Sequence, residues 1–174
     1  MLTKLLTTSL IICATLYVPT SSAQLSSPIA GAVPAASGKG AGIHSPLSPI
    51  APLPVRADVL SWDMLADVKT KNNKGSIVPV FNVTQMALHL KKQRVQGFMM
   101  PLEPGEKQSH FILSSVPMNC GFCVPGGPES MIEVRSKTPV KYTAEPVVVE
   151  GNFQVLVNDQ FGVYYKIADA QPVK

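Results

Sequence analysis

Five short apolar segments, separated by polar or glycine-containing turns, constrain the fold of this chain more than any other feature. They span residues 94–102, 109–116, 130–137, 145–157 and 163–173. Segments of this length that are rich in Val, Ile, Phe and Tyr are typical of β-strands. Along the fourth segment one face carries an alternating set, Val147, Val149, Gly151, Phe153 and Val155. Such alternation indicates a strand with one buried face, so the chain is predicted to be mostly β.

Two glycines inside these segments predict how the strands close on one another. Gly97 in the first segment and Gly151 in the fourth mark positions where a tightly coiled strand leaves no room for a side chain. The strand order and the glycine placement resemble a small five-stranded OB-fold barrel. Another small barrel or a β-sandwich remains an alternative, because the connection after the third strand is short and carries Pro139. We expect Gly151→Val to destabilise the domain far more than Gly126→Val, which we assign to a loop.

One or two short helices are expected on the N-terminal side of the barrel. Residues 58–69 carry apolar side chains on one helical face: Val59, Trp62, Leu65 and Val68. A turn and a strand over 76–81 should follow. A second helix is expected over 85–92, with Thr84 as its N-cap.

Residues 1–23 have the pattern of a secretory signal peptide. A short basic start precedes an apolar stretch over 5–18, and Ser21 and Ala23 are placed for cleavage before Gln24. The apolar stretch is shorter than the roughly 20 residues that span a bilayer. We therefore expect cleavage and a periplasmic or secreted product that has no membrane span.

The segment over residues 24–56 differs in composition from the rest of the chain, since Ser, Pro, Ala and Gly dominate it. A segment of this kind buries too little apolar surface to offset its ordering entropy, which predicts a disordered tether. Residues 57–174 then form a single domain. After signal removal 14 basic residues face 11 acidic ones. That net charge of +3 is too small to indicate a nucleic-acid partner.

Cys120 and Cys123 are the two cysteines that remain after Cys13 leaves with the signal peptide, and they stand in the sequence CGFC. Export and an even cysteine count favour a disulfide across a tight turn. A copper or zinc site is the alternative, because MNCGFC offers two thiolates and the Met118 thioether, which His110 could complete. Thioredoxin-type redox chemistry is less favoured, since the following VPGGP is a poor helix start for activating a thiolate.

The loop around the cysteines is the predicted binding site. Besides the two cysteines it comprises Asn119, Gly121, Phe122, Pro125, Gly126, Gly127 and Pro128. No serine-nucleophile motif, carboxylate pair or phosphate loop accompanies it. We predict a non-catalytic module that binds an unknown protein or small ligand and needs no cofactor, with a copper or zinc ion as the alternative.

Four stretches of the domain resemble the DUF3299 family, exported bacterial proteins with a domain of unknown function. The stretches are GFMMPLE, HFILS, PGGPES and VEGNFQVLVNDQFGVYYKIADA, which together run through most of the predicted domain. The resemblance implies an exported bacterial protein of uncharacterised activity. It also implies association with a transport system, which makes a transport component the expected partner.

Overall fold

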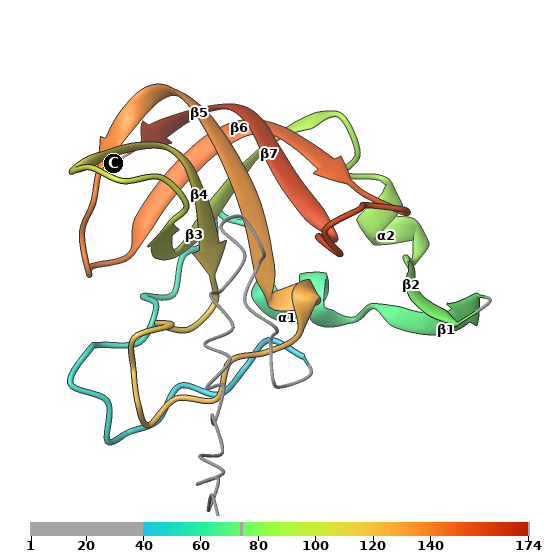
Figure 1. Ribbon diagram of the computed structural model, residues 1–174, viewed down its shortest axis with the longest axis horizontal. Helices are drawn as coiled ribbons and strands as arrows, with labels where there is room; N and C mark the ends of the chain where they lie inside the picture. The colour runs from blue at the N-terminus through green and yellow to red at the C-terminus, as the bar shows by residue number, and fades with distance from the viewer. Residues whose placement is uncertain (1–39, 74, 174) are drawn as a thin grey trace, which may run out of the picture.

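The computed structural model describes residues 40–73 and 75–173, and Figure 1 shows their arrangement. The elements in chain order are α1 (Trp62–Ala66), β1 (Lys69–Asn73), β2 (Ser76–Val80), α2 (Val83–Met86), β3 (Lys91–Pro101), β4 (Lys107–Ser114), η1 (Pro128–Ser130), β5 (Met131–Lys141), β6 (Val147–Val155) and β7 (Tyr165–Val173). The predicted signal peptide and residues 24–39 of the predicted tether lie outside the described residues. No helix within the described part of the chain is long and apolar enough to cross a membrane.

Five strands close into the barrel that the sequence predicts. Their order around the barrel is β3-β4-β5-β7-β6, and β6 pairs with β3 to complete the circle. All neighbouring pairs are antiparallel except β5 and β7, which are parallel. This mixed order, with the last two strands exchanged in space, is OB-like. The β1–β2 hairpin is a separate two-stranded sheet that projects from the side of the barrel (Figure 1).

Gly97 and Gly151 occupy the tight positions that their placement in the sequence predicts. β3 pairs with β6 as far as Gly97 and with β4 from Phe98 onward, so Gly97 is the corner between two partners. A Cβ there would lie 2.9 Å from the Ser114 carbonyl oxygen. At Gly151 the β6–β7 register shifts, and a Cβ would lie 2.7 Å from the Ala168 carbonyl oxygen. Both glycines are therefore required by backbone proximity.

The helix α1 packs on the barrel core but is shorter than predicted. It covers five residues instead of the expected 58–69, and the chain enters β1 soon afterwards. Leu65 is fully buried in the core cluster, and its carbonyl accepts a hydrogen bond of 2.7 Å from the Tyr165 hydroxyl. The indole N–H of Trp62 donates to the Gln96 carbonyl at 2.8 Å. Two polar contacts, of which the one to Tyr165 is buried, thus join this short helix to β3 and β7.

The second helix begins earlier than predicted and has a different cap. Asn82, and not Thr84, is the N-cap: its side chain accepts from the Gln85 backbone N–H while the Gln85 side chain accepts from the Asn82 backbone N–H. This reciprocal capping box satisfies two backbone donors at once. The helix ends at Met86, and Leu90 with a φ of 61° turns the chain into β3. Lys91 and Lys92, expected in the helix, therefore belong to a strand.

Residues 40–56, the C-terminal part of the predicted tether, make specific contacts in the structure. Ile43 forms a β-bridge with Val124, and Ser48 and His44 make local hydrogen bonds to Ile50. Backbone pairing of this kind needs no apolar periodicity, so composition alone could not indicate it. The disordered tether over residues 24–56 and the domain over residues 57–174 stay predictions.

Candidate binding loop

The loop between β4 and β5, residues 115–130, is closed by the predicted disulfide. Cys120 and Cys123 are bonded, and their Cα atoms lie 5.4 Å apart, a normal separation for a bridge. The backbone makes two successive tight turns here, because Cys120 N–H donates to the Pro117 carbonyl and Cys123 N–H to the Cys120 carbonyl. Cys120 is buried while Gly121 and Phe122 are exposed. The bridge therefore anchors the loop and leaves its tip in solvent.

Residues 40–43 brace the same loop from the N-terminal side. The Ile43 N–H donates to the Val124 carbonyl at 2.8 Å, and the Val124 N–H donates back at 2.9 Å. The Ser115 hydroxyl donates to the Ala41 carbonyl. These contacts fix the backbone immediately after the disulfide, so covalent and hydrogen-bonded constraints act on adjacent residues.

The glycines of the PGGP sequence lie in the predicted loop but are closely packed, so Gly126→Val is not the mild change that a loop position suggests. A Cβ on Gly126 would overlap the Gly40 carbonyl oxygen and crowd Ser130. A Cβ on Gly127 would overlap the carboxylate of Glu129, which accepts the Gly40 N–H at 2.7 Å. Gly126 and Gly127 are both buried. They let the loop, residue 40 and the buried Glu129 approach one another closely.

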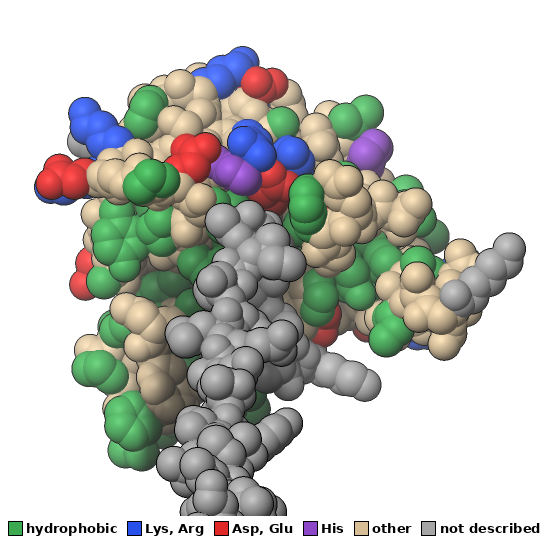
Figure 2. Space-filling view, in the orientation of Figure 1, with side chains coloured by type: hydrophobic (Ala, Val, Ile, Leu, Met, Phe, Trp, Pro, Cys, Tyr) green, Lys and Arg blue, Asp and Glu red, His purple; other side chains and the backbone are tan. Residues whose placement is uncertain are grey.

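Four apolar side chains are exposed on the paired loops, and we call this set the apolar loop surface. Their exposed fractions are 66% for Ile43, 73% for Leu47, 61% for Phe122 and 48% for Val124. Figure 2 shows apolar side chains gathered at the lower left, over the loops that Figure 1 draws in blue and gold. Clustered exposed apolar side chains mark interaction sites more often than single ones do. Ile43 and Leu47 were missed from the sequence because their segment had no strand or helix pattern.

The other two predicted metal ligands are engaged elsewhere. His110 lies on β4, where its Nε2 is 2.9 Å from a Glu133 carboxylate oxygen and its Nδ1 is 3.9 Å from Glu103. Met118 is half-buried beside Phe98 and Tyr142 in a small cavity. In the described ranges, 40–73 and 75–173, no three His, Cys, Asp or Glu side chains are grouped to hold a metal. The copper or zinc site stays a prediction, and it would require the disulfide to open.

The backbone after Cys123 differs from that of a redox centre. Val124 pairs with Ile43, and residues 125–127 have no regular secondary structure before the three-residue η1 begins at Pro128. A redox-active CxxC needs its first cysteine at the start of a helix, whose amides stabilise the thiolate. The described residues that follow Cys123 supply no such helix.

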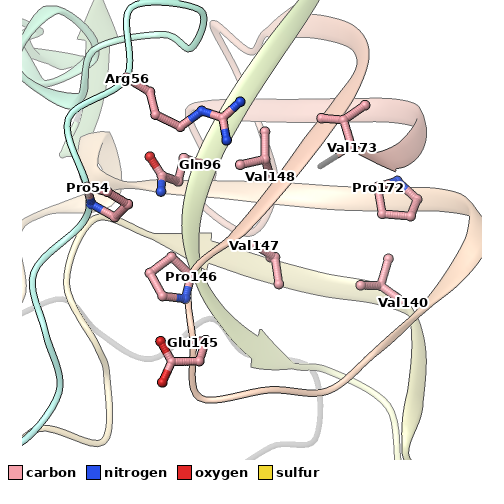
Figure 3. Close-up of a pocket in the computed structure, with 10 residues that line it drawn as sticks. All are labelled: Pro54, Arg56, Gln96, Val140, Glu145, Pro146, Val147, Val148, Pro172 and Val173. Atoms are coloured by element: carbon pink, nitrogen blue, oxygen red, sulfur yellow. The ribbon is translucent and has the colours of Figure 1, made fainter.

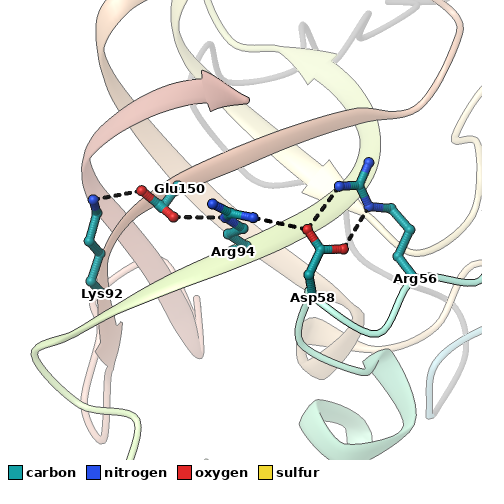
Figure 4. A network of polar contacts seen from close by, with 5 residues as sticks. All are labelled: Arg56, Asp58, Lys92, Arg94 and Glu150. Atoms are coloured by element: carbon teal, nitrogen blue, oxygen red, sulfur yellow. Dashed lines mark hydrogen bonds and ion pairs between the residues drawn. The ribbon is translucent and has the colours of Figure 1, made fainter. Parts of the chain in front are cut away.

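A network of ion pairs, which the sequence analysis does not predict, runs across the outside of β3 and β6. Asp58 accepts hydrogen bonds from Arg56 and Arg94, and Glu150 pairs with Arg94 at 2.7 Å and Lys92 at 2.6 Å (Figure 4). The hydrogen bonds from Arg56 and Arg94 hold the pKa of Asp58 well below its usual range. Those from Lys92 and Arg94 lower the pKa of Glu150. The sequence sign that could have indicated this network is the pair of basic residues, Lys92 and Arg94, two positions apart in the stretch that forms β3.

A cavity of about 470 Å³ lies where β5 ends, β6 begins and β7 ends, next to residues 54–56 (Figure 3). Its lining includes Arg56 from the ionic network and Gln96 from β3. The residues come from five separate stretches of chain, so sequence reasoning could not assemble them. The cavity shares no lining residue with the apolar loop surface.

Comparison with known proteins gives a single structural similarity. No family model matches the sequence, and no curated protein does. Among solved structures the chain is similar to a DUF3299 family protein from Pseudomonas aeruginosa, at 20% sequence identity and a TM-score of 0.38. The match covers 51% of this chain and 64% of that one, so this chain spans less than two thirds of that protein. The similarity is to the family that the sequence motifs resemble.

Proposed function

We propose that this protein is an exported, non-catalytic binding module that presents its disulfide-closed loop to a protein partner. The observation that carries the proposal is the double constraint on the loop. The Cys120–Cys123 bond closes its tip, and the Ile43–Val124 bridge holds the residue that follows. A loop held in one conformation loses little conformational entropy on binding, which favours affinity.

The side chains on this loop favour a protein as the partner. Phe122 is 61% exposed at the tip, next to a buried and covalently fixed Cys120. Exposed aromatic residues on a rigid backbone are the anchors that dominate many protein interfaces. Ile43 and Val124, two further members of the apolar loop surface, lie opposite each other in the β-bridge that follows the disulfide. A partner with a shallow apolar pocket would bury Phe122.

The polar groups near the loop support binding over catalysis. The buried carboxylate of Glu129 accepts the Gly40 N–H, and both cysteine sulfurs are used in the disulfide. Each group therefore has a structural partner already. A general acid or nucleophile needs a free site within reach of a substrate.

The proposed compartment is the periplasm or the cell exterior of a bacterium. Disulfides persist in oxidising compartments and are rare in the reducing cytosol. The signal-peptide pattern over residues 1–23 supports the same location. The family resemblance makes a component of a transport system the partner to test first.

Site-specific photocrosslinking tests this proposal in the native compartment. A photoreactive phenylalanine analogue is placed at Phe122, and in a control protein at Phe161. Both phenylalanines are 61% exposed, but Phe161 lies between β6 and β7 and outside the apolar loop surface. We expect one protein adduct from position 122 and none from position 161.

Competition establishes that the adduct reports a specific site. Excess unlabelled protein should suppress the adduct, and excess Phe122→Ser protein should not, because the anchor is missing. The proposal fails if both positions yield the same adducts, or if the two competitors suppress the adduct equally.

A further inference from the structure

The cavity beside residues 54–56 has the size of a small-ligand site (Figure 3). Its volume of about 470 Å³ lies within the range of about 300–1,000 Å³ that is usual for such sites. Valines form much of the wall, and Val140 and Val148 are each only 8% exposed. Pro54, Pro146 and Pro172 complete the apolar lining. A ligand must therefore present mostly apolar surface to fit.

Gln96 places an unused amide in this apolar wall. Its residue is only 5% exposed, and its carbonyl oxygen accepts the Trp62 indole N–H. Its side-chain amide forms no hydrogen bond to any residue in the described ranges. A primary amide offers both a donor and an acceptor. Because Gln96 lines the cavity, both groups are available to hydrogen-bond a polar group of a ligand there.

Arg56 gives the same cavity a positive charge. Its Nε and Nη2 atoms donate to Asp58, each at 2.9 Å, which leaves Nη1 available for another acceptor. Asp58 is shared with Arg94, and Glu150 is shared by Arg94 and Lys92 (Figure 4). The network thus holds three cations and two carboxylates. The Nη1 atom of Arg56, which the network leaves free, favours an anionic ligand group next to Arg56.

We propose that this cavity binds a small apolar carboxylate, with the carboxylate at Arg56 and Gln96 and the apolar body against the valines. An Arg guanidinium and an amide N–H are both donors suited to carboxylate oxygens. Glu145 lies at the opposite edge of the cavity from Arg56 (Figure 3) and would repel a ligand bound in the reverse direction. The carboxylate can come from a free organic acid or from the C-terminus of a short apolar peptide.

Calorimetric titration with three probes tests the proposal on the disulfide-bonded protein. The probes are octanoate, N-acetyl-valyl-valine with a free carboxylate, and the same dipeptide as its C-terminal amide. We expect at least one acid to bind with a dissociation constant below about 1 mM and the amide to bind at least about tenfold more weakly. Tighter binding of octanoate assigns the site to free acids, and tighter binding of the dipeptide acid assigns it to peptide termini.

Three variants tie binding to the cavity. Arg56→Gln and Gln96→Leu should each weaken binding of the preferred acid about tenfold. Arg94→Gln is the matched control, because Arg94 bonds the same Asp58 but does not line the cavity. Its affinity should stay within about threefold of the original. Equal losses in Arg56→Gln and Arg94→Gln would contradict a direct contact with Arg56.

Amide NMR shifts on the unmodified protein keep the test valid if a variant does not fold. Addition of the acid should shift the backbone amides of Gln96, Val148 and Val173 and leave those of Phe122 and Val124 unchanged. The proposal is overturned if neither acid binds, if the dipeptide amide binds as well as its acid, or if the shifts fall outside the cavity.

Discussion

Ile43 and Val124, which are distant in sequence, exchange a pair of backbone hydrogen bonds directly behind the disulfide-closed loop. This bridge is the central structural relationship of the candidate binding loop. It joins Ile43 to the loop of the domain, although the composition around Ile43 predicts a tether. The apolar side chains of Ile43 and Val124 are exposed. The backbone contact that braces the loop therefore also holds two apolar side chains in a position where a partner could contact them.

Removal of residues 1–44 should therefore destabilise the barrel. A chain that begins at Ser45 loses both bridge hydrogen bonds and the Gly40–Glu129 contact. A chain that begins at Gly40 keeps them and is the reference. Net contributions of about 0.5–1.5 kcal/mol per hydrogen bond, reduced by the ordering entropy, give an expected loss of about 1–2 kcal/mol. Urea unfolding of the two chains measures it, and identical midpoints would contradict the bracing role.

Glycine substitutions separate packed positions from open ones. Gly126→Val and Gly151→Val should each lower the free energy of unfolding by about 2 kcal/mol or more, because a branched side chain would overlap backbone atoms at both sites. Gly121→Val is the control: it lies in the same loop as Gly126, and a Cβ there would meet no atom within 4 Å. It should change stability by less than about 0.5 kcal/mol. A tolerated Gly126→Val, measured by thermal or urea unfolding, would show that the loop is not packed on residue 40.

The barrel itself was predictable because each strand carries its own local signal. The alternation from Val147 to Val155 and the glycines at 97 and 151 gave the strands, their tight corners and their closure. β5 runs on past Pro139 because the register against β4 shifts, so that no β4 residue pairs with the proline. A proline is tolerated in a strand at such an irregularity. The sequence therefore predicts that this strand ends at residue 137, whereas β5 ends at Lys141.

The candidate site was predictable only where its residues are adjacent in sequence. Cys120 and Cys123 stand three positions apart, and the predicted export would favour their pairing. Ile43, Arg56 and Gln96 reach their sites through tertiary contacts that leave no local pattern. His110 is a candidate ligand by residue type alone, and in the structure its ring pairs with Glu133 on the neighbouring strand.

Two fully buried glutamines should respond differently to the same substitution. Gln85 donates to the carbonyls of Met64 and Leu65 and accepts from Asn82. Gln108 donates to the Gly105 carbonyl, but its Oε1 atom has no partner among the described residues. Gln85→Met should cost about 2–3 kcal/mol, because it leaves buried backbone groups unpaired. Gln108→Met should cost at least about 1 kcal/mol less, because the loss of one hydrogen bond is offset by removal of an unpaired buried acceptor. Comparable losses in urea unfolding would mean that the Gln108 Oε1 atom has a partner.

The ionic network should make stability depend on acid pH. The pKa values of Asp58 and Glu150 are lowered in the folded protein, so both groups bind protons more weakly there than in the unfolded chain. Their stabilising effect is present above the unfolded-state pKa values of about 4 and is lost as the pH falls toward the lower folded-state values.

Thermal midpoints between neutral pH and about pH 2 measure this dependence. Asp58→Asn should lower the thermal midpoint at neutral pH. It should also make the midpoint fall less as the pH is lowered. Glu106→Gln is the control, since the ion pairs of the described residues do not include that carboxylate. If the thermal midpoint of Asp58→Asn falls as much with decreasing pH as that of the original protein, the network makes no contribution.

The state of the two cysteines in protein taken from its native compartment tests the central claim most directly. The measurement is an intact mass combined with alkylation of free thiols before and after reduction. We predict a chain that begins at Gln24, carries no free thiol, and gains two alkyl groups once a reductant is added. Two free thiols in the untreated protein, or a copper or zinc ion retained with both cysteines reduced, would contradict the disulfide-closed binding loop.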